Sequence, residues 1–394
     1  MTTSYYTPTK VILGKGAELQ TGRLLKEAGA TKVLIHYGSE RTRKPGGLME
    51  TITAQLDKEG IGYVFLGGVQ PNPRLSLANK GIELAKKEKI DFLLAVGGGS
   101  VIDSAKVIAY GLYNGGDVWD FYDGKRTPQG AFPVAAVLTL AAAGSEMSAS
   151  AVITNDLAGN LKRGFSTDYV RCRFAVMNPE LTYTVSPYQT ASGAADIMMH
   201  TMERFFHPGK SLQLTDELSL ALIRTAAENG IKALENPEDY DARASLMWAS
   251  SLSHNDLMQQ GNDQKGDWAC HQLEHELSGM FDVAHGAGLA AIWASWARYV
   301  MSVDYSRFAY FGEGVFGLKR TGDDKADAER TVLAMEDFYR KISMPTNLRE
   351  LGIEPTDSQI EELAVKCTFF GKRTVGSFKV LGKEDIADIY RLAR

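Results

Sequence analysis

The segment Phe92-Leu-Leu-Ala-Val-Gly-Gly-Gly-Ser-Val-Ile-Asp-Ser-Ala-Lys106 begins as a continuous apolar run, breaks at three glycines and continues with helical spacing. Such an apolar run indicates a strand buried on both faces, as in a parallel sheet. Gly97, Gly98 and Gly99 let the backbone approach a pyrophosphate, whose charge the amides of the helix start favour. Ser100 or Asp103 could cap this helix. The alternative is a tight strand-to-helix turn without a ligand.

The rest of the chain divides into two kinds of segment. Strands are predicted at residues 32–37, 62–67, 92–96, 132–139, 151–154 and 174–177, with helices at 47–59 and 79–88. Further helices are predicted at residues 191–206, 211–235, 240–260, 268–278, 289–303, 326–342 and 358–370. We therefore expect a nucleotide-binding α/β domain with a Rossmann-like parallel sheet over residues 1–185. The strands at 151–154 and 174–177 are expected to be the last of this region. An all-α, metal-binding domain should follow over residues 186–394, with cofactor and substrate meeting in a cleft between the two.

Two other loops follow predicted strands. The small residues from Thr139 to Glu146, which include Ser145, suggest a second nucleotide-contacting loop. The loop Tyr37-Gly38-Ser39-Glu40-Arg41-Thr42-Arg43-Lys44 bears on the choice between NAD and NADP. Ser39 leaves room for a 2′-phosphate, which Arg41, Arg43 and Lys44 could neutralise. These residues favour NADP(H), whereas Glu40 keeps NAD(H) possible; the alternative is a solvated basic loop.

A metal site is predicted in the helical half. Asp196 and His200 are four residues apart and share one helical face. His271 and His285 add two imidazoles. One carboxylate and three imidazoles suit Fe(II) or Zn(II). The small residues 286–288 would either let substrate approach the metal or let helices pack closely.

Composition narrows the classes of partner and compartment. The length of 394 residues favours two domains, and the net charge of −5 gives no reason to expect nucleic acid or an anionic membrane. Three cysteines without a C-x-x-C pair fit a reducing compartment. No secretory leader or membrane-spanning stretch is visible, so we expect a cytoplasmic protein.

Together these motifs resemble the iron-containing (group III) alcohol dehydrogenase family, and within it the branch of NADPH-linked butanol dehydrogenases and broad-range aldehyde reductases. The resemblance covers nearly the whole chain. It rests on Tyr5-Tyr-Thr-Pro-Thr-Lys-Val-Ile-Leu-Gly-Lys-Gly16, the 97–106 loop, Ala143-Gly-Ser-Glu146, Asn178-Pro-Glu-Leu-Thr182, Asp196-x-x-x-His200 and His271…His275…His285-Gly286.

The resemblance implies a dehydroquinate synthase-like architecture and a homodimer in which N-terminal strands pair across chains. It implies metal ligands at Asp196, His200, His271 and His285, and a pyrophosphate loop over residues 97–100. It also implies cofactor contacts at Thr139, Ser145, Lys162 and Leu181, and a role for His275 in proton transfer or substrate positioning.

The expected activity is hydride transfer between NAD(P)H and a small aliphatic aldehyde or alcohol, assisted by a divalent ion acting as a Lewis acid. Three alternatives stay open: a metal-dependent lyase of the same fold, a non-catalytic nucleotide-binding protein and a zinc protease. The protease interpretation rests on His271-Gln-Leu-Glu274-His275, which matches H-x-x-E-H. His207 and His254 are expected to be surface or structural residues, and Trp268 to belong to the core.

Overall fold

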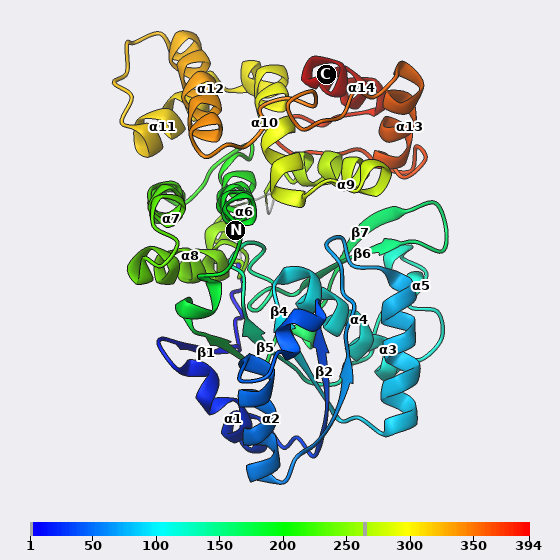
Figure 1. The fold of residues 1–394 in the computed structure, drawn as a ribbon. Helices are drawn as coiled ribbons and strands as arrows, with labels where there is room; N and C mark the ends of the chain where they lie inside the picture. Colours follow the sequence, from blue (N-terminus) through cyan, green and yellow to red (C-terminus); the bar gives the residue numbers. More distant parts are fainter. Residues whose placement is uncertain (1–2, 263–265) are drawn as a thin grey trace. The chain divides into compact units, whose positions relative to one another are not determined.

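The computed structural model describes residues 3–262 and 266–394, apart from the side chain of Arg41 (Figure 1). Two compact units make up the chain: residues 6–185, and residues 186–394 together with the N-terminal segment that ends at Tyr5. The first is an α/β unit and the second is helical, which confirms the predicted fold class.

A six-stranded parallel sheet forms the centre of the first unit. Its strands are β1 (Lys10–Leu13), β2 (Lys32–Tyr37), β3 (Gly62–Leu66), β4 (Phe92–Gly97), β5 (Val134–Leu138) and β8 (Phe174–Met177). Their spatial order is β1-β8-β5-β4-β2-β3. Every neighbouring pair is parallel, as the continuous apolar runs predict.

Helices cover both faces of this sheet. On one face, α1 (Thr21–Glu27) and α2 (Leu48–Glu59) bury Leu24 and Ile52 against strand residues such as Val33. On the other face, α4 (Gly99–Asn114) packs on β4, and α3 (Leu75–Glu88) packs on α4. The short helix α5 (Trp119–Tyr122) follows α4 and contacts it through the rings of Phe121 and Tyr110.

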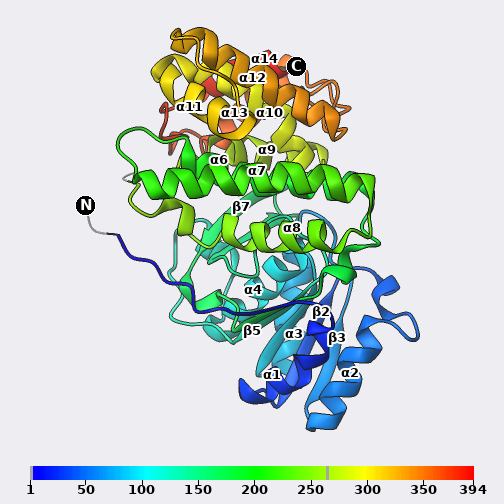
Figure 2. The same cartoon turned by 90° about the vertical axis from the view of Figure 1, so that its left-hand side faces the viewer.

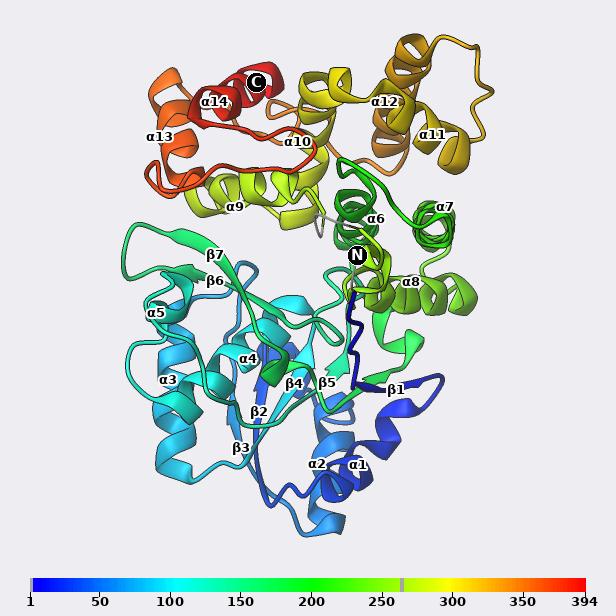
Figure 3. The ribbon, with the colours of Figure 1, turned by 180° about the vertical axis from the view of Figure 1, so that it is seen from behind.

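Residues 151–154 form a strand of the first unit, as predicted, but this strand does not join the parallel sheet. The strand β6 (Ser150–Asn155) pairs antiparallel with β7 (Leu161–Ser166) in a separate two-stranded sheet (Figure 3). The connection reverses the chain at Gly159 and Asn160, which both have positive φ. A tight turn of this kind leads to an antiparallel hairpin, because a parallel partner needs a long crossover.

The second unit consists of nine helices among its described residues. They are α6 (Pro187–Phe205), α7 (Gln213–Glu235), α8 (Tyr240–Ser253), α9 (Ala269–Phe281), α10 (His285–Val300), α11 (Tyr305–Phe316), α12 (Asp324–Lys341), α13 (Asp357–Cys367) and α14 (Lys383–Ala393). The long helix α7 packs against α6 and α8 (Figure 2). At the other end of the unit, α9 and α10 pack with α13 and α14 (Figure 3).

Short 3-10 helices connect these elements. They are η1 (Ala17–Gln20), η2 (Glu40–Arg43), η3 (Asp168–Val170), η4 (Pro179–Thr182), η5 (Leu257–Gln259) and η6 (Met301–Val303). Within the described residues, every helix is too short or too polar to cross a bilayer.

Candidate metal centre and nucleotide loops

Helix α6 places the first two predicted metal ligands. The Ser186 hydroxyl caps this helix by accepting a hydrogen bond from the Gln189 amide, and Pro187 occupies its first turn. Ten residues into the helix, Asp196 and His200 project one turn apart, and each is only 3% exposed. The sequence therefore fixes where the helix starts and which of its faces carries the pair.

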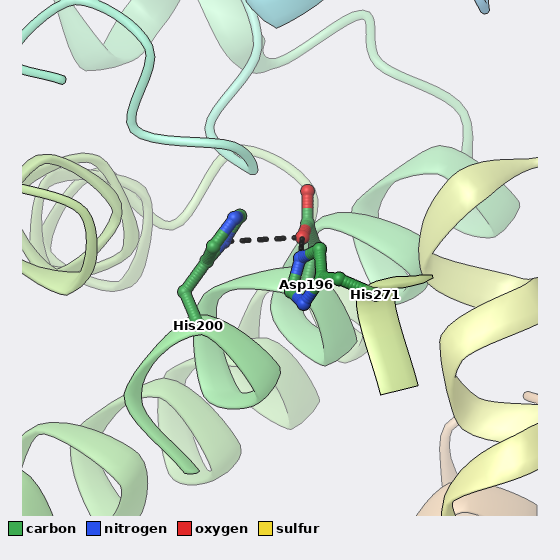
Figure 4. A group of neighbouring side chains, drawn as sticks. All are labelled: Asp196, His200 and His271. Carbon is green, nitrogen blue, oxygen red and sulfur yellow. Dashed lines mark ion pairs between the residues drawn. The ribbon is translucent and has the colours of Figure 1, made fainter. Parts of the chain in front are cut away.

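Three imidazoles converge on one oxygen of Asp196. Its Oδ1 lies 3.2 Å from His200 Nδ1, 3.7 Å from His271 Nε2 and 3.7 Å from His285 Nε2. Figure 4 shows the first two rings turned toward the carboxylate. His271 comes from α9 and His285 is the first residue of α10. The structure thus brings all four predicted ligands together, from three helices.

The donor atoms of this cluster fit a divalent ion. Asp196 Oδ1, His200 Nδ1 and His271 Nε2 are buried, and none has a hydrogen-bond partner among the described residues. Ligand atoms of these three side chains all lie within 4.8 Å of one another. Unsatisfied buried polar atoms are costly, so a partner from outside the chain would stabilise them. Carboxylate oxygen and imidazole nitrogen are ligands that Zn(II) and Fe(II) accept.

The protonation states of the cluster favour metal binding at two of its members. Burial lowers the pKa of His200 well below its usual value, so this ring is a neutral imidazole at pH 7. Burial alone would raise the pKa of Asp196, but the facing histidines hold it below its usual range. For His271, burial opposes protonation, but the carboxylates of Glu203 and Asp196 raise its pKa to about 9. A bound cation would have to take the place of that proton.

Glu274 is not placed to act as the base of a zinc protease. Its carboxylate is fully buried, and it accepts hydrogen bonds from His285 Nδ1 and from the Ser278 hydroxyl. In the H-x-x-E-H interpretation, His271 and His275 would share the zinc, and Glu274 would activate a water molecule. In the structure the ligand atoms of His271 lie instead within 4.8 Å of those of Asp196 and His200. The geometry therefore favours the dehydrogenase interpretation.

Three further aromatic side chains lie beside the ligands. The ring of His275 is 5.9 Å from that of His285 between centroids. His254 is stacked on His200 with centroids 4.1 Å apart, although it was expected at the surface or in a structural role. Trp268, expected in the core, is only half-buried, and its ring lies 5.5 Å from that of His271. Nothing in the spacing of His254 along the chain indicates this position.

The two predicted nucleotide loops meet at the carboxyl ends of β4 and β5. A Cβ on Gly98 would lie 3.2 Å from Leu140 Cβ, and a Cβ on Gly99 would lie 2.8 Å from Ala143 Cβ. Thr139 follows β5 directly and donates its amide to the Gly97 carbonyl at 3.1 Å. The glycines therefore let the second loop pack closely on the start of α4. Both nucleotide binding and close packing require residues without a side chain at these positions.

Asp103 and Ser145 are joined by a hydrogen bond between their side chains. Asp103 accepts hydrogen bonds from the Ser145 hydroxyl and, at 2.9 Å, from the Val152 amide. The N-cap of α4 is Gly98, and no described side chain forms a capping hydrogen bond there. Neither Ser100 nor Asp103 therefore caps the helix. Asp103 instead ties α4 to the second loop and to β6.

The other predicted cofactor residues lie in the sheet unit. Gly38 and Ser39 follow β2, and Arg41 lies in η2, although its side chain is outside the described residues. Lys162 is buried in β7, and Leu181 packs against the core from η4. From β2 the chain runs to β3 at one edge of the sheet and then to β4 on the other side of β2. Ligands of α/β sheets bind at the carboxyl ends of strands flanking such a reversal, where Gly38 and Gly97 lie.

A parallel sheet of this type and a buried carboxylate–imidazole cluster fit a metal-dependent oxidoreductase. The chain matches the family model of iron-containing alcohol dehydrogenases over residues 8–179, and the C-terminal model of that family over residues 190–394. It therefore belongs to the iron-containing alcohol dehydrogenase family.

Individual relatives match over nearly their full lengths. NADH-dependent butanol dehydrogenase A of Clostridium acetobutylicum is 38% identical over 388 residues, which cover 98% of both chains. NADPH-dependent aldehyde reductase YqhD of Escherichia coli is 32% identical over 392 residues, covering 99% of this chain and 98% of the relative. The crystal structure of NADH-dependent butanol dehydrogenase A from Thermotoga maritima has a TM-score of 0.94 and 34% identity, covering 100% of this chain and 98% of that one.

Proposed function

We propose that this protein is a metal-dependent NAD(P)H-linked reductase of small aliphatic aldehydes, which also oxidises the corresponding alcohols. The observation that carries the proposal is the convergence of three imidazole nitrogens on the buried Oδ1 of Asp196. Relatives named butanol dehydrogenase and aldehyde reductase, each matching over nearly its whole length, support the substrate class.

In this proposal Asp196, His200, His271 and His285 hold the ion. A divalent ion held there would supply Lewis-acid polarisation of the aldehyde carbonyl. The burial of Asp196 and His200 keeps bulk water away from the reacting group, which strengthens the local electrostatics. His275, beside His285, would deliver the proton that the product oxygen needs. Replacing His275 with Gln should lower kcat while leaving the bound metal per chain unchanged.

For the nucleotide we propose NADP(H) as the preferred form. Ser39 places no carboxylate at the end of β2, and Arg43 and Lys44 are exposed cations nearby. NAD(H) is the second candidate for a specific reason: Glu40 accepts a hydrogen bond from the Tyr37 hydroxyl at 2.5 Å and lies 3.7 Å from Arg43, so it offsets part of the positive charge. Relatives named NADH-dependent support this second candidate.

We also propose a cytoplasmic homodimer. Among the described residues the three cysteines are buried and none forms a disulfide, as in proteins of reducing compartments. The N-terminal strand β1 forms one edge of the sheet, with β8 on its inner side. An edge strand can extend a sheet by pairing with the same strand of a second copy.

The test is the loss of reduced-nicotinamide absorbance with butanal, with NADPH and NADH run side by side, before and after chelation. The proposal expects turnover that chelation abolishes and metal restores, with NADPH preferred. Faster turnover with NADH would refute the nucleotide preference and keep the enzyme. No turnover with either nucleotide in metal-loaded protein would refute the proposed activity.

A further inference from the structure

We propose that Glu203 and Glu274 are positioning residues that hold His271 and His285 with Nε2 facing Asp196. This inference rests on the proposed metal site, because it concerns how two of its ligands are held. Each glutamate acts on the site through the histidine that it holds.

Glu203 fixes both the backbone and the ring of His271. It lies on α6 seven residues after Asp196, so both carboxylates project from the same face of the helix. Its Oε1 accepts the His271 amide at 3.0 Å, and its Oε2 accepts a hydrogen bond from His271 Nδ1. The side chain of Glu203 is only 2% exposed. The Glu203 carboxylate thus holds the first turn of α9 against α6 and fixes the orientation of the His271 ring.

Glu274 holds His285 in the same way from a different helix. Its Oε2 accepts a hydrogen bond from His285 Nδ1, and its Oε1 accepts one from the Ser278 hydroxyl. A Cβ on Gly288 would lie 2.9 Å from Glu274 Cγ and 3.2 Å from its Oε1. Any larger residue at position 288 would therefore push this carboxylate away from the ring that it holds.

The two contacts have the same chemical consequence. An imidazole that donates from Nδ1 presents its lone pair at Nε2, which is the atom facing Asp196 in both residues. A carboxylate behind a ligating histidine also raises the basicity of the ring. Loss of such a partner costs about 10- to 100-fold in metal affinity in characterised sites.

A purely structural role for these glutamates makes a different prediction. If they only join helices, their removal should lower stability in the same way with and without metal. If they position ligands, metal affinity should fall even in variants whose metal-free form stays folded. The visible absorption spectrum of bound Co(II) should also change, because the positions and intensities of its bands depend on ligand geometry.

The experiment compares Glu203→Gln and Glu274→Gln with the wild-type chain after metal removal by chelation. Zn(II) affinity is measured by competition with a chromophoric chelator, coordination by Co(II) visible absorption, and folding by Tm in excess chelator. Glu336→Gln is the matched control, because Glu336 is a largely buried carboxylate that pairs with Arg298 at 2.6 Å.

We expect each site variant to raise the Zn(II) Kd about 10- to 100-fold and to alter the Co(II) spectrum, while the control stays within about twofold of wild type. Each glutamine variant is tested on its own, so if one fails to fold the other still decides. Folded variants that bind Zn(II) as tightly as wild type, with an unchanged Co(II) spectrum, would overturn the inference while leaving the metal site intact. A wild-type chain that binds neither ion stoichiometrically would overturn the proposed metal site and this inference with it.

Discussion

Lys106 is a fully buried lysine in α4, and its replacement with Met should destabilise the sheet unit and loosen the second nucleotide loop. The ammonium donates to the backbone carbonyls of Ser145 at 2.7 Å, Ser148 at 2.9 Å and Ser150 at 2.8 Å. Burial lowers the pKa of Lys106 below its usual value, and the nearby carboxylate of Asp103 offsets part of this shift. These contacts tie the loop and the start of β6 to the helix that opens at the glycine triplet.

The magnitude follows from what the Lys106→Met substitution would leave behind. Methionine has a similar length and fills the same space, so little cavity forms. Three carbonyls lose their donor, and the charge of Asp103 loses its compensating ammonium. Removing one partner of a buried charged network costs about 3–5 kcal/mol. Because 1 kcal/mol corresponds to about 2–4 °C for a unit of this size, the Tm of the sheet unit should fall by about 6–20 °C.

The assay is thermal unfolding, combined with hydrogen–deuterium exchange of the amides between residues 139 and 155. Exchange should rise in this segment first, and nucleotide affinity should fall with it. Lys32→Met is the control, because Lys32 pairs with Glu88 at 2.8 Å where solvent screens the two charges, so its loss should lower the Tm far less. A Lys106→Met protein with the Tm and exchange pattern of the control would refute this reasoning.

Three more predictions concern packing, pH and the nucleotide. Gly286→Ala should lower stability by about 1–3 kcal/mol and weaken metal binding, since its Cβ would clash with the Ser192 carbonyl; unchanged Tm and metal content would contradict this. Burial lowers the pKa of His36 to about 4, whereas the same ring in the unfolded chain titrates near 6.5. The free energy of unfolding is therefore highest above pH 6.5, and the contribution of the neutral ring is lost as the pH falls through 4. That loss is about 3 kcal/mol, and His36→Asn should flatten the decline in acid unfolding curves; an equally steep decline would show that His36 is not its source. Ser39→Asp should shift the ratio of NADPH to NADH kcat/KM at least tenfold toward NADH, and an unmoved ratio would show that the end of β2 does not select the nucleotide.

Much of the architecture could be predicted because its signals are local. The apolar runs at residues 32–37 and 174–177 correspond to β2 and β8 without any shift of their ends. By contrast, the run at residues 151–154 forms the predicted strand, but in a sheet separate from the parallel one. Strand character depends on neighbouring residues, whereas the choice of partner strand depends on the turn that follows and on tertiary packing.

The site was predictable to the extent that one helix carries it. Asp196 and His200 share a face of α6, and that spacing can be read directly from the sequence. Glu203 continues the same face and could have been found by extending the helical period by one turn. In the sequence Glu274 stands out only as part of an H-x-x-E-H string, because its partner His285 belongs to a different helix.

The small residues at positions 286–288 illustrate a choice that only packing could decide. The sequence left open whether they make room for substrate or for close helix packing. A Cβ on Gly286 would clash with the backbone of Ser192 in α6, and one on Gly288 would crowd Glu274 in α9. Close packing of three helices therefore explains both glycines, and it places His285 beside Asp196.

The most direct test of the central claim is a titration of metal-free protein with Zn(II), Co(II) or Fe(II), in which bound metal and butanal-dependent NAD(P)H oxidation are measured together. The account predicts that activity rises in proportion to bound metal and saturates at one ion per chain. Asp196→Ala should abolish both binding and turnover. Full activity in protein shown to contain no metal, or saturation without any gain of activity, would contradict the account.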